Sequence, residues 1–227
     1  MTEPPATRIT FTKTDIPDMG PIEREFAAIR PYGGASLIMA DPPWHHEDWS
    51  QSGNKKKTAS HHYQTQPLSW IKALPVHVLA GHDCVLWLWT TSPLLPVAID
   101  VMAAWGFRWS TSGAWIKRTV TGKLAFGGGR RLRSCHEPYI IATKGRPPVA
   151  EAIRSAIEAH VDTEDPLTET GWTVEAVRRE HSRKPDEAFE AARRMVDGPA
   201  VELFSRERRN GWTVWGNEVG KFAEAAE

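Results

Sequence analysis

The chain has 227 residues, and its 28 basic and 28 acidic side chains cancel to a formal net charge of zero. This length accommodates one substantial domain with a sizeable core and is short for two. The neutral balance excludes a globally basic coat for nucleic acid, although local basic patches remain compatible with it. No stretch is as apolar as a membrane span or a signal region requires, and the two cysteines suggest a reducing compartment. We therefore expect a cytoplasmic protein without membrane contact.

Residues 1–34 are rich in proline and glycine and weakly periodic, which predicts a loosely packed N-terminal arm. Residues 35–227 are expected to form a single domain in which strand-like and helix-like segments alternate. The expected strands are 36–40, 83–90, 107–117, 138–145, 200–204 and 211–216. The expected helices are 68–80, with a break at Pro75, 93–106 and 184–196. This alternation favours a parallel or mixed sheet in a layered α/β domain.

Three segments interrupt this alternation. Residues 45–66 are polar and contain histidines, and residues 151–170 are acidic, which predicts a surface helix and loop. Residues 118–135 are rich in glycine and arginine. The basic residues in and around this segment are Lys117, Arg118, Lys123, Arg130, Arg131, Arg133, Lys144 and Arg146. A solvated loop is the ordinary explanation of such a run, but glycines let the backbone approach a ligand and arginines suit phosphates.

The sequence LIMADPPWHH, residues 37–46, places a carboxylate, two prolines and a tryptophan at the end of a buried strand. Proline cannot donate a hydrogen bond to a sheet, so the strand is expected to end at Asp41. In open α/β sheets, ligands bind at the carboxyl ends of the strands. Asp41 and a carbonyl held by proline offer two acceptors in fixed geometry. The side chain of Trp44 offers a face on which a flat base could stack.

These groups suit the binding of an aromatic amine such as the exocyclic amine of adenine. The lone pair of that amine is delocalised into the ring, which makes it a poor nucleophile. Two acceptors on its two hydrogens would draw the nitrogen towards a tetrahedral geometry, so the predicted catalysis is positioning and preorganised electrostatics. An Asp-Pro-Pro sequence is also an ordinary turn, and the prediction therefore depends on the other motifs of the chain.

The other motifs carry a resemblance to a known family. The matching segments, in chain order, are DPPW (41–44), HYQT (62–65), IKALPV (71–76), VLWLWTTSPLLPVAIDVMAAWGF (85–107), WIK (115–117), HEPYIIATKGRP (136–147), REHSRKPDE (179–187) and ELFSRERRNGWTVWGNE (202–218). Together they resemble the MT-A-type family, the DPPW-containing N6-adenine methyltransferases whose eukaryotic members include the catalytic subunit that methylates mRNA adenosine. The combination is highly specific, and it is most similar to the prokaryotic and phage branch.

The resemblance implies a class I, Rossmann-like, S-adenosylmethionine-dependent methyltransferase fold, permuted so that the catalytic strand precedes the cofactor-binding strand. The catalytic residues that it implies are Asp41, Pro42, Pro43 and Trp44. The implied S-adenosylmethionine-binding residues are Asp41, Phe204, Lys184 at the methionine carboxylate, Glu202 and Arg206 by the ribose, and Asn217 and Glu218 at the ribose or adenine end. The expected substrate-binding residues are Trp44, Tyr63, Lys117, Arg130, Arg131 and Arg133. Taken singly, Lys184 could be a surface lysine, Glu202 a strand-end acid and Asn217 a turn former.

The sequence departs from the family pattern at two motifs. Glu207, Arg208 and Arg209 follow the ELF segment where eukaryotic catalytic subunits carry a His-Asn pair, so the contacts of that pair are not transferred. Gln66 ends a motif that usually ends in methionine. The histidines near the corner, with two neighbouring acids, are His45, His46, His61, His62, Glu47 and Asp48. Their spacing matches no standard zinc site, and no metal is expected.

The corner and the resemblance together predict an S-adenosylmethionine-dependent adenine N6-methyltransferase that modifies specific sites in DNA. RNA is the alternative substrate, and a methyltransferase for another amine would use the same corner. The alternative from another class is a catalytically silent nucleic-acid-binding partner of an active methyltransferase. Retention of Asp41 and Lys184 argues for activity. The resemblance also leaves a homodimer open.

Overall fold

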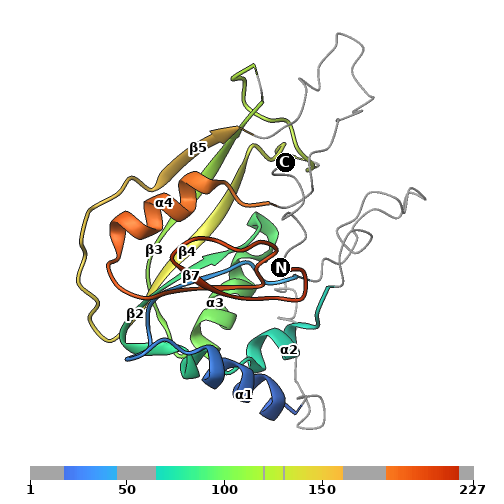
Figure 1. Cartoon of the computed structure of the whole chain (residues 1–227). Coiled ribbons are helices and arrows are strands. Elements are labelled where there is room, and N and C mark those ends of the chain that lie inside the picture. Colours follow the sequence, from blue (N-terminus) through green and yellow to red (C-terminus); the bar gives the residue numbers. More distant parts are fainter. Residues whose placement is uncertain (1–17, 45–64, 120, 130, 161–182, 220–227) are drawn as a thin grey trace, which may run out of the picture.

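The computed structural model describes residues 18–44, 65–119, 121–129, 131–160 and 183–219. These residues form a seven-stranded mixed sheet with the strand order β5-β3-β4-β2-β1-β6-β7. Figure 1 shows the sheet with its helices. The strands are β1 (Ala35–Ala40), β2 (Ala80–Trp89), β3 (Arg108–Arg118), β4 (His136–Lys144), β5 (Ala156–His160), β6 (Ala200–Leu203) and β7 (Trp212–Trp215). The helices are α1 (Gly20–Ile29), α2 (Leu68–Ala73), α3 (Leu95–Ala104) and α4 (Asp186–Met195), with short 3-10 turns η4 (Val76–Val78) and η5 (Ser92–Leu94).

The strand that ends in the DPPW corner lies at the centre of the sheet. β1 pairs in parallel with β2 on one side and with β6 on the other. β7 extends the parallel half beyond β6, whereas β4 runs antiparallel to both β2 and β3. A strand from the start of the chain therefore lies beside one from its end. This order agrees with the predicted Rossmann-like fold in which the catalytic strand comes first.

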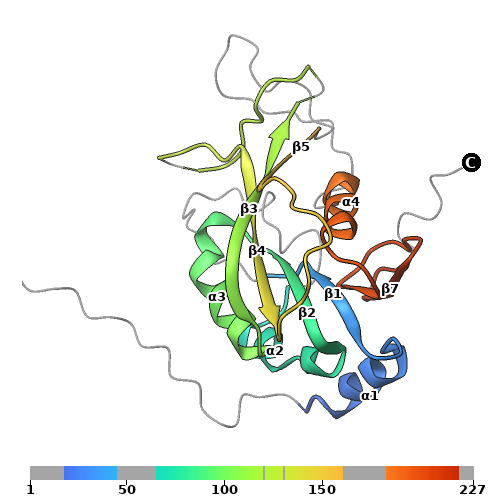
Figure 2. The same ribbon diagram turned by 90° about the vertical axis from the view of Figure 1, so that its left-hand side faces the viewer.

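Helices cover both faces of the sheet. Successive side chains of a strand point to opposite faces, and β1 is buried on both. Ile38 packs in a core with α1, α2 and α3, whereas Leu37 and Met39 pack in a second core with α4. Figure 2 shows the strands between α3 and α4. The continuous apolar run of β1 is thus explained by its central position, since strands covered on both faces do not alternate with polar residues.

The predicted strands and helices are confirmed, with boundaries shifted by a few residues. The predicted break at Pro75 is also confirmed, because α2 ends at Ala73 and η4 starts at Val76. None of the described helices is long and apolar enough to cross a membrane.

Two of the expectations are wrong. Residues 20–29, in the expected loose arm, form α1, and its Phe26 is fully buried in the core against the ring of Trp215. Residues 156–160, where a surface helix and loop were expected, form the edge strand β5, which pairs in parallel with β3. Ile157 and Ala159 of this strand are buried, so alternate residues face the core although the segment is acidic overall.

Candidate active site

The candidate site lies where two neighbouring parallel strands end. β1 ends at Ala40, directly before Asp41, and β6 ends at Leu203, directly before Phe204. Ala40 and Leu203 are paired in register, so Asp41 and Phe204 leave the sheet side by side. Phe204 has a φ of 64°, a left-handed conformation that residues with a bulky side chain rarely adopt. Backbone strain of this kind is concentrated at functional sites.

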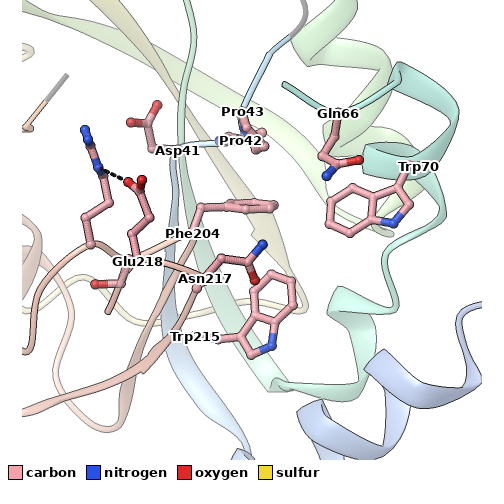
Figure 3. Close-up of a pocket in the computed structure, with 12 residues that line it drawn as sticks. Asp41, Pro42, Pro43, Gln66, Trp70, Phe204, Trp215, Asn217 and Glu218 are labelled. Carbon is pink, nitrogen blue, oxygen red and sulfur yellow. Dashed lines mark hydrogen bonds and ion pairs between the residues drawn. The ribbon is translucent and has the colours of Figure 1, made fainter. Parts of the chain in front are cut away.

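A cavity of about 230 Å³ opens at these strand ends (Figure 3). Its aromatic lining consists of Trp70, Phe204 and Trp215, and its polar side chains are Asp41, Gln66, Ser205, Arg206, Asn217 and Glu218. The rings of Phe204 and Trp215 meet edge to face, with their centroids 5.6 Å apart. Arg206 is fixed on the wall, because its Nε lies 2.8 Å from Oε2 of Glu218. The cavity therefore combines apolar ring surfaces with carboxylate and amide groups.

Asp41 is held by a buried lysine. The Nζ of Lys184 lies 2.7 Å from Oδ2 of Asp41 and 2.7 Å from Oε1 of Glu137. The other Glu137 oxygen, Oε2, lies 2.7 Å from Nζ of Lys117. Among the described residues no group donates a hydrogen bond to the second Asp41 oxygen, Oδ1. The lysine therefore engages one oxygen of Asp41 and leaves the other for the cavity.

The ionisation of Asp41, Lys184 and Glu137 is coupled, because each lies next to a residue of opposite charge. Burial raises the pKa of Asp41, and Lys184 opposes that effect. Burial also disfavours the charged form of Lys184, but Asp41 and Glu137 outweigh it and raise the pKa of the lysine. For Glu137, the two lysines overcome the burial and lower the pKa to about 2. Lys184 and Glu137 are thus both charged at neutral pH.

The backbone of the corner is fixed by hydrogen bonds of its own. The amide of Trp44 donates to the carbonyl of Pro42 at 2.7 Å, and the amide of Gln66 donates to the carbonyl of Pro43 at 2.9 Å. Each carbonyl oxygen has a second lone pair. The corner therefore combines rigid carbonyl groups with a carboxylate oxygen that accepts no hydrogen bond from the described residues. That these groups bind an amine stays a prediction.

The expectation that Trp44 presents an exposed ring is wrong. Its side chain is 5% exposed, belongs to the main core and does not line the cavity. Its indole Nε1 donates a hydrogen bond to the carbonyl of Trp89 at 3.2 Å. Sequence could not reveal this direction, because a tryptophan after two prolines can turn either towards the ligand or towards the neighbouring strand.

Not all of the expected cofactor residues line the same cavity. Asp41, Phe204, Arg206, Asn217 and Glu218 line the main one. Lys184 and Glu202 line a smaller neighbouring cavity, to which Asp41, Phe204 and Arg206 also contribute. Burial raises the pKa of Glu202 to about 7 despite the nearby Arg209. The Nε of Arg209 lies 3.6 Å from Oε2 of Glu202, and neither atom has a hydrogen-bond partner in the described residues.

The expected nucleic-acid-binding residues do not lie together on one surface of the described part of the chain. Lys117 pairs with Glu137 and is only partly exposed, so it belongs to the buried charges behind Asp41. Arg131 and Arg133 are exposed, and the guanidinium of Arg133 lies over the ring of Phe126, 4.5 Å from its centroid. Tyr63 and Arg130 lie outside the described residues, as do the histidines that were considered for a metal.

The amino-acid sequence profile of the MT-A70 family matches residues 35–218. The chain belongs to the MT-A70 family.

Individual relatives agree with this assignment. The type II methyltransferase M.MunI of Mycoplasma sp is 26% identical over 219 residues, which cover 88% of this chain and 84% of that protein. The N(6)-adenine-specific methyltransferase METTL4 is 30% identical in Mus musculus and in Homo sapiens, over 82% of this chain. The chain spans only 37% and 38% of those two proteins. The family resemblance found in the sequence is thereby confirmed.

Membership of the MT-A70 family implies S-adenosylmethionine as the cofactor, and the lining of the main cavity fits it. Phe204 and Trp215 provide ring surfaces for a flat purine, and Asn217 and Glu218 provide polar groups for its edge or for ribose hydroxyls. Asp41 is the carboxylate that a nearby sulfonium cation would favour. Gly216 is required for close packing here, because a Cβ would lie 2.3 Å from the carbonyl oxygen of Ser205.

Sequence reasoning missed Glu137 and two of the aromatic residues. Glu137 lies in the HEPY segment and is the one acid among the basic residues from 117 to 146, a signal that could have marked it as a lysine partner. Trp70 was placed only in an expected helix, and Trp215 only in an expected strand and a matching motif. Sequence does not show which of eleven tryptophans face a cavity.

Proposed function

We propose that this MT-A70 protein transfers a methyl group from S-adenosylmethionine to the N6 amine of adenine in DNA. The observation that carries the proposal is the geometry of Asp41, whose Oδ2 is held by Lys184 while Oδ1 is left for the cavity. Asp41 would accept a hydrogen bond from the exocyclic amine and direct its lone pair, which positions the nucleophile without a strong base. The bound cofactor would supply an electrophilic methyl group on its sulfonium.

The carbonyl of Pro42 is the second acceptor in this proposal. Pro42 and Pro43 line the cavity with Asp41, and the hydrogen bonds from Trp44 and Gln66 keep the corner rigid. Two acceptors in fixed positions suit the two hydrogens of a primary amine. An amine with one hydrogen would satisfy only one of them, so the corner favours unmethylated adenine over the methylated product.

Adenine and DNA are supported by the relatives and by the surface. The names of several relatives specify N(6)-adenine or N(6)-adenosine. M.MunI, 84% of whose length this chain covers, is named a type II methyltransferase, which favours DNA. A relative from Cryphonectria parasitica is named an RNA methyltransferase and keeps RNA as the alternative. Exposed Arg131 and Arg133 would contact the phosphate backbone of either nucleic acid.

The test is methyl transfer from labelled S-adenosylmethionine to double-stranded DNA, single-stranded DNA and RNA of matched sequence, followed by identification of the product nucleosides. We expect N6-methyladenine in DNA. If only RNA is labelled, the proposed substrate is RNA and not DNA. If the product is N4-methylcytosine, the proposed target base is cytosine and not adenine. Cofactor binding without transfer to any of the three would favour the silent-partner alternative. The Asp41→Asn variant is the matched control, because it keeps the size of the side chain and removes its charge.

A further inference from the structure

A chain of four alternating charges leads from the catalytic corner into the sheet. Asp41 follows β1, Lys184 precedes α4, Glu137 lies on β4 and Lys117 lies on β3. Three contacts, each 2.7 Å long, join them in the order Asp41–Lys184–Glu137–Lys117. The chain of charges thus connects four elements that are far apart in sequence.

Glu137 is an interior member of this chain. Its side chain is 14% exposed and that of Lys184 is 7% exposed, so each needs partners of opposite charge. Lys184 is bound from two sides, by Asp41 and by Glu137. If Glu137 were absent, the ammonium group of Lys184 would be free to turn towards the smaller cavity, where Oε2 of Glu202 has no hydrogen bond. Glu137 is therefore one of the two carboxylates that hold the ammonium group of Lys184 in place.

We infer that Glu137 is a positioning residue, which acts through Lys184 to keep one oxygen of Asp41 directed at the target amine. This inference rests on the proposed function, in which Asp41 accepts a hydrogen bond from adenine. Lys184 donates to Oδ2 and thereby keeps Oδ1 for the cavity. Glu137 does not line either cavity, and the salt bridges join it to Asp41 through Lys184.

Glu137 and Lys184 shift the pKa of Asp41 in opposite directions. The charged groups that act on Asp41 are Lys184, Glu137, Arg206 and Glu202, and those that act on Glu137 are Lys184 and Lys117. The negative charge of Glu137 raises the pKa of Asp41, whereas Lys184 lowers it. Removal of the Glu137 charge should therefore lower the pKa of Asp41, and removal of Lys184 should raise it.

The first experiment measures the ionisation of Asp41 without turnover. The protein is labelled with carbon-13 at the aspartate carboxyl carbons, and the Asp41 signal is assigned by its loss in Asp41→Asn. We expect the pKa of Asp41 to fall in Glu137→Gln and to rise in Lys184→Met. Glu151→Gln, which removes the carboxylate of an exposed pair with Arg194, is the matched control and should leave the Asp41 titration unchanged. An Asp41 pKa that is unchanged in Glu137→Gln would overturn the inference.

The second experiment separates positioning from cofactor binding. Glu137→Gln keeps an oxygen acceptor for Lys184, whereas Glu137→Leu removes it. We expect kcat to fall roughly ten- to a hundredfold in Glu137→Leu and less in Glu137→Gln. The dissociation constant of S-adenosylmethionine should rise by a clearly smaller factor, although Lys184 is also one of the expected cofactor residues. Equal losses in kcat and in cofactor affinity would show that Glu137 serves the cofactor instead.

The two proposals fail separately. If the wild-type chain transfers no methyl group, the proposed function is wrong, and the Asp41 titration still decides the role of Glu137. If the wild type is active, and if Glu137→Gln has the same kcat and the same Asp41 pKa as the control Glu151→Gln, the inference is wrong and the proposed function stands. Should Glu137→Leu fail to fold, these two measurements on Glu137→Gln decide the question.

Discussion

The indole Nε1 of Trp44 donates a hydrogen bond to the backbone carbonyl of Trp89, at 3.2 Å. This contact links the last residue of the DPPW corner to the end of β2, the strand next to β1. Asp41, three residues earlier, faces the cavity instead. Within the motif, Asp41 therefore lines the cavity, whereas Trp44 is buried and fixes the corner to β2.

Replacing Trp44 with alanine should first reduce stability. The ring is 5% exposed in the core, and deletion of a buried aromatic side chain costs about 3–5 kcal/mol. Trp44→Phe, which keeps a ring but loses the hydrogen bond, should cost less. Urea unfolding measures both. If Trp44→Ala keeps wild-type stability and loses affinity for nucleic acid, the stacking role expected from sequence is correct after all.

The position of Asp41 could be predicted from sequence, and that of Trp44 could not. Two prolines after an apolar strand end the strand, and this places Asp41 directly after its last residue. The direction of Trp44 depends on whether β2 offers a carbonyl group and a space, which is a tertiary contact between residues 45 positions apart. Glu137 was missed for the same reason, since its lysine partner Lys184 is distant in sequence.

Replacing Asp41 with alanine should abolish most methyl transfer while cofactor binding remains detectable. We expect kcat to fall by at least about a hundredfold, because a positioned acceptor is removed. Lys184 keeps Glu137 as its partner, so the buried charge is not left unpaired and the fold should persist. Isothermal titration calorimetry with S-adenosylmethionine measures cofactor binding, and the labelled-methyl assay measures methyl transfer. Asp100→Ala, which removes an exposed carboxylate, is the control; a near wild-type rate for Asp41→Ala would contradict the corner mechanism.

Replacing Glu202 with glutamine should alter the pH dependence of stability. Burial raises the pKa of Glu202 from its ordinary 4.5 to about 7. The folded protein therefore binds this proton more tightly than the unfolded chain, and the wild type loses stability as pH rises from 4.5 through about 7. The side chain of glutamine does not ionise, so this pH-dependent contribution to stability is absent from the variant. The unfolding free energy of Glu202→Gln relative to wild type should rise over this interval and then level off, as measured by urea unfolding. A difference that is constant with pH would contradict the raised pKa.

The acidic and basic edges of the sheet were harder to predict than its centre. β5 was missed because its alternating pattern is only five residues long and lies among acids. Arg118 was counted in the basic segment, but it forms a two-bond pair with Glu158 of β5. The number of basic residues in a segment therefore overstates how many of them are available to bind nucleic acid. Exposure selects the arginines that remain candidates for phosphate binding.

Replacing Arg131 and Arg133 together with alanine should weaken nucleic-acid binding and reduce its salt dependence. Both side chains are exposed in the described residues, and removal of each arginine that binds a phosphate should lower the slope of log affinity against log salt by about one unit. Fluorescence anisotropy with a labelled oligonucleotide at several salt concentrations measures affinity and slope together. The matched control is the double replacement of Arg24 and Arg154, two exposed arginines outside this segment. Equal slopes for both double variants would contradict a role of Arg131 and Arg133 in phosphate binding. A reduced slope for the Arg131 and Arg133 variant alone would identify these two side chains as phosphate contacts.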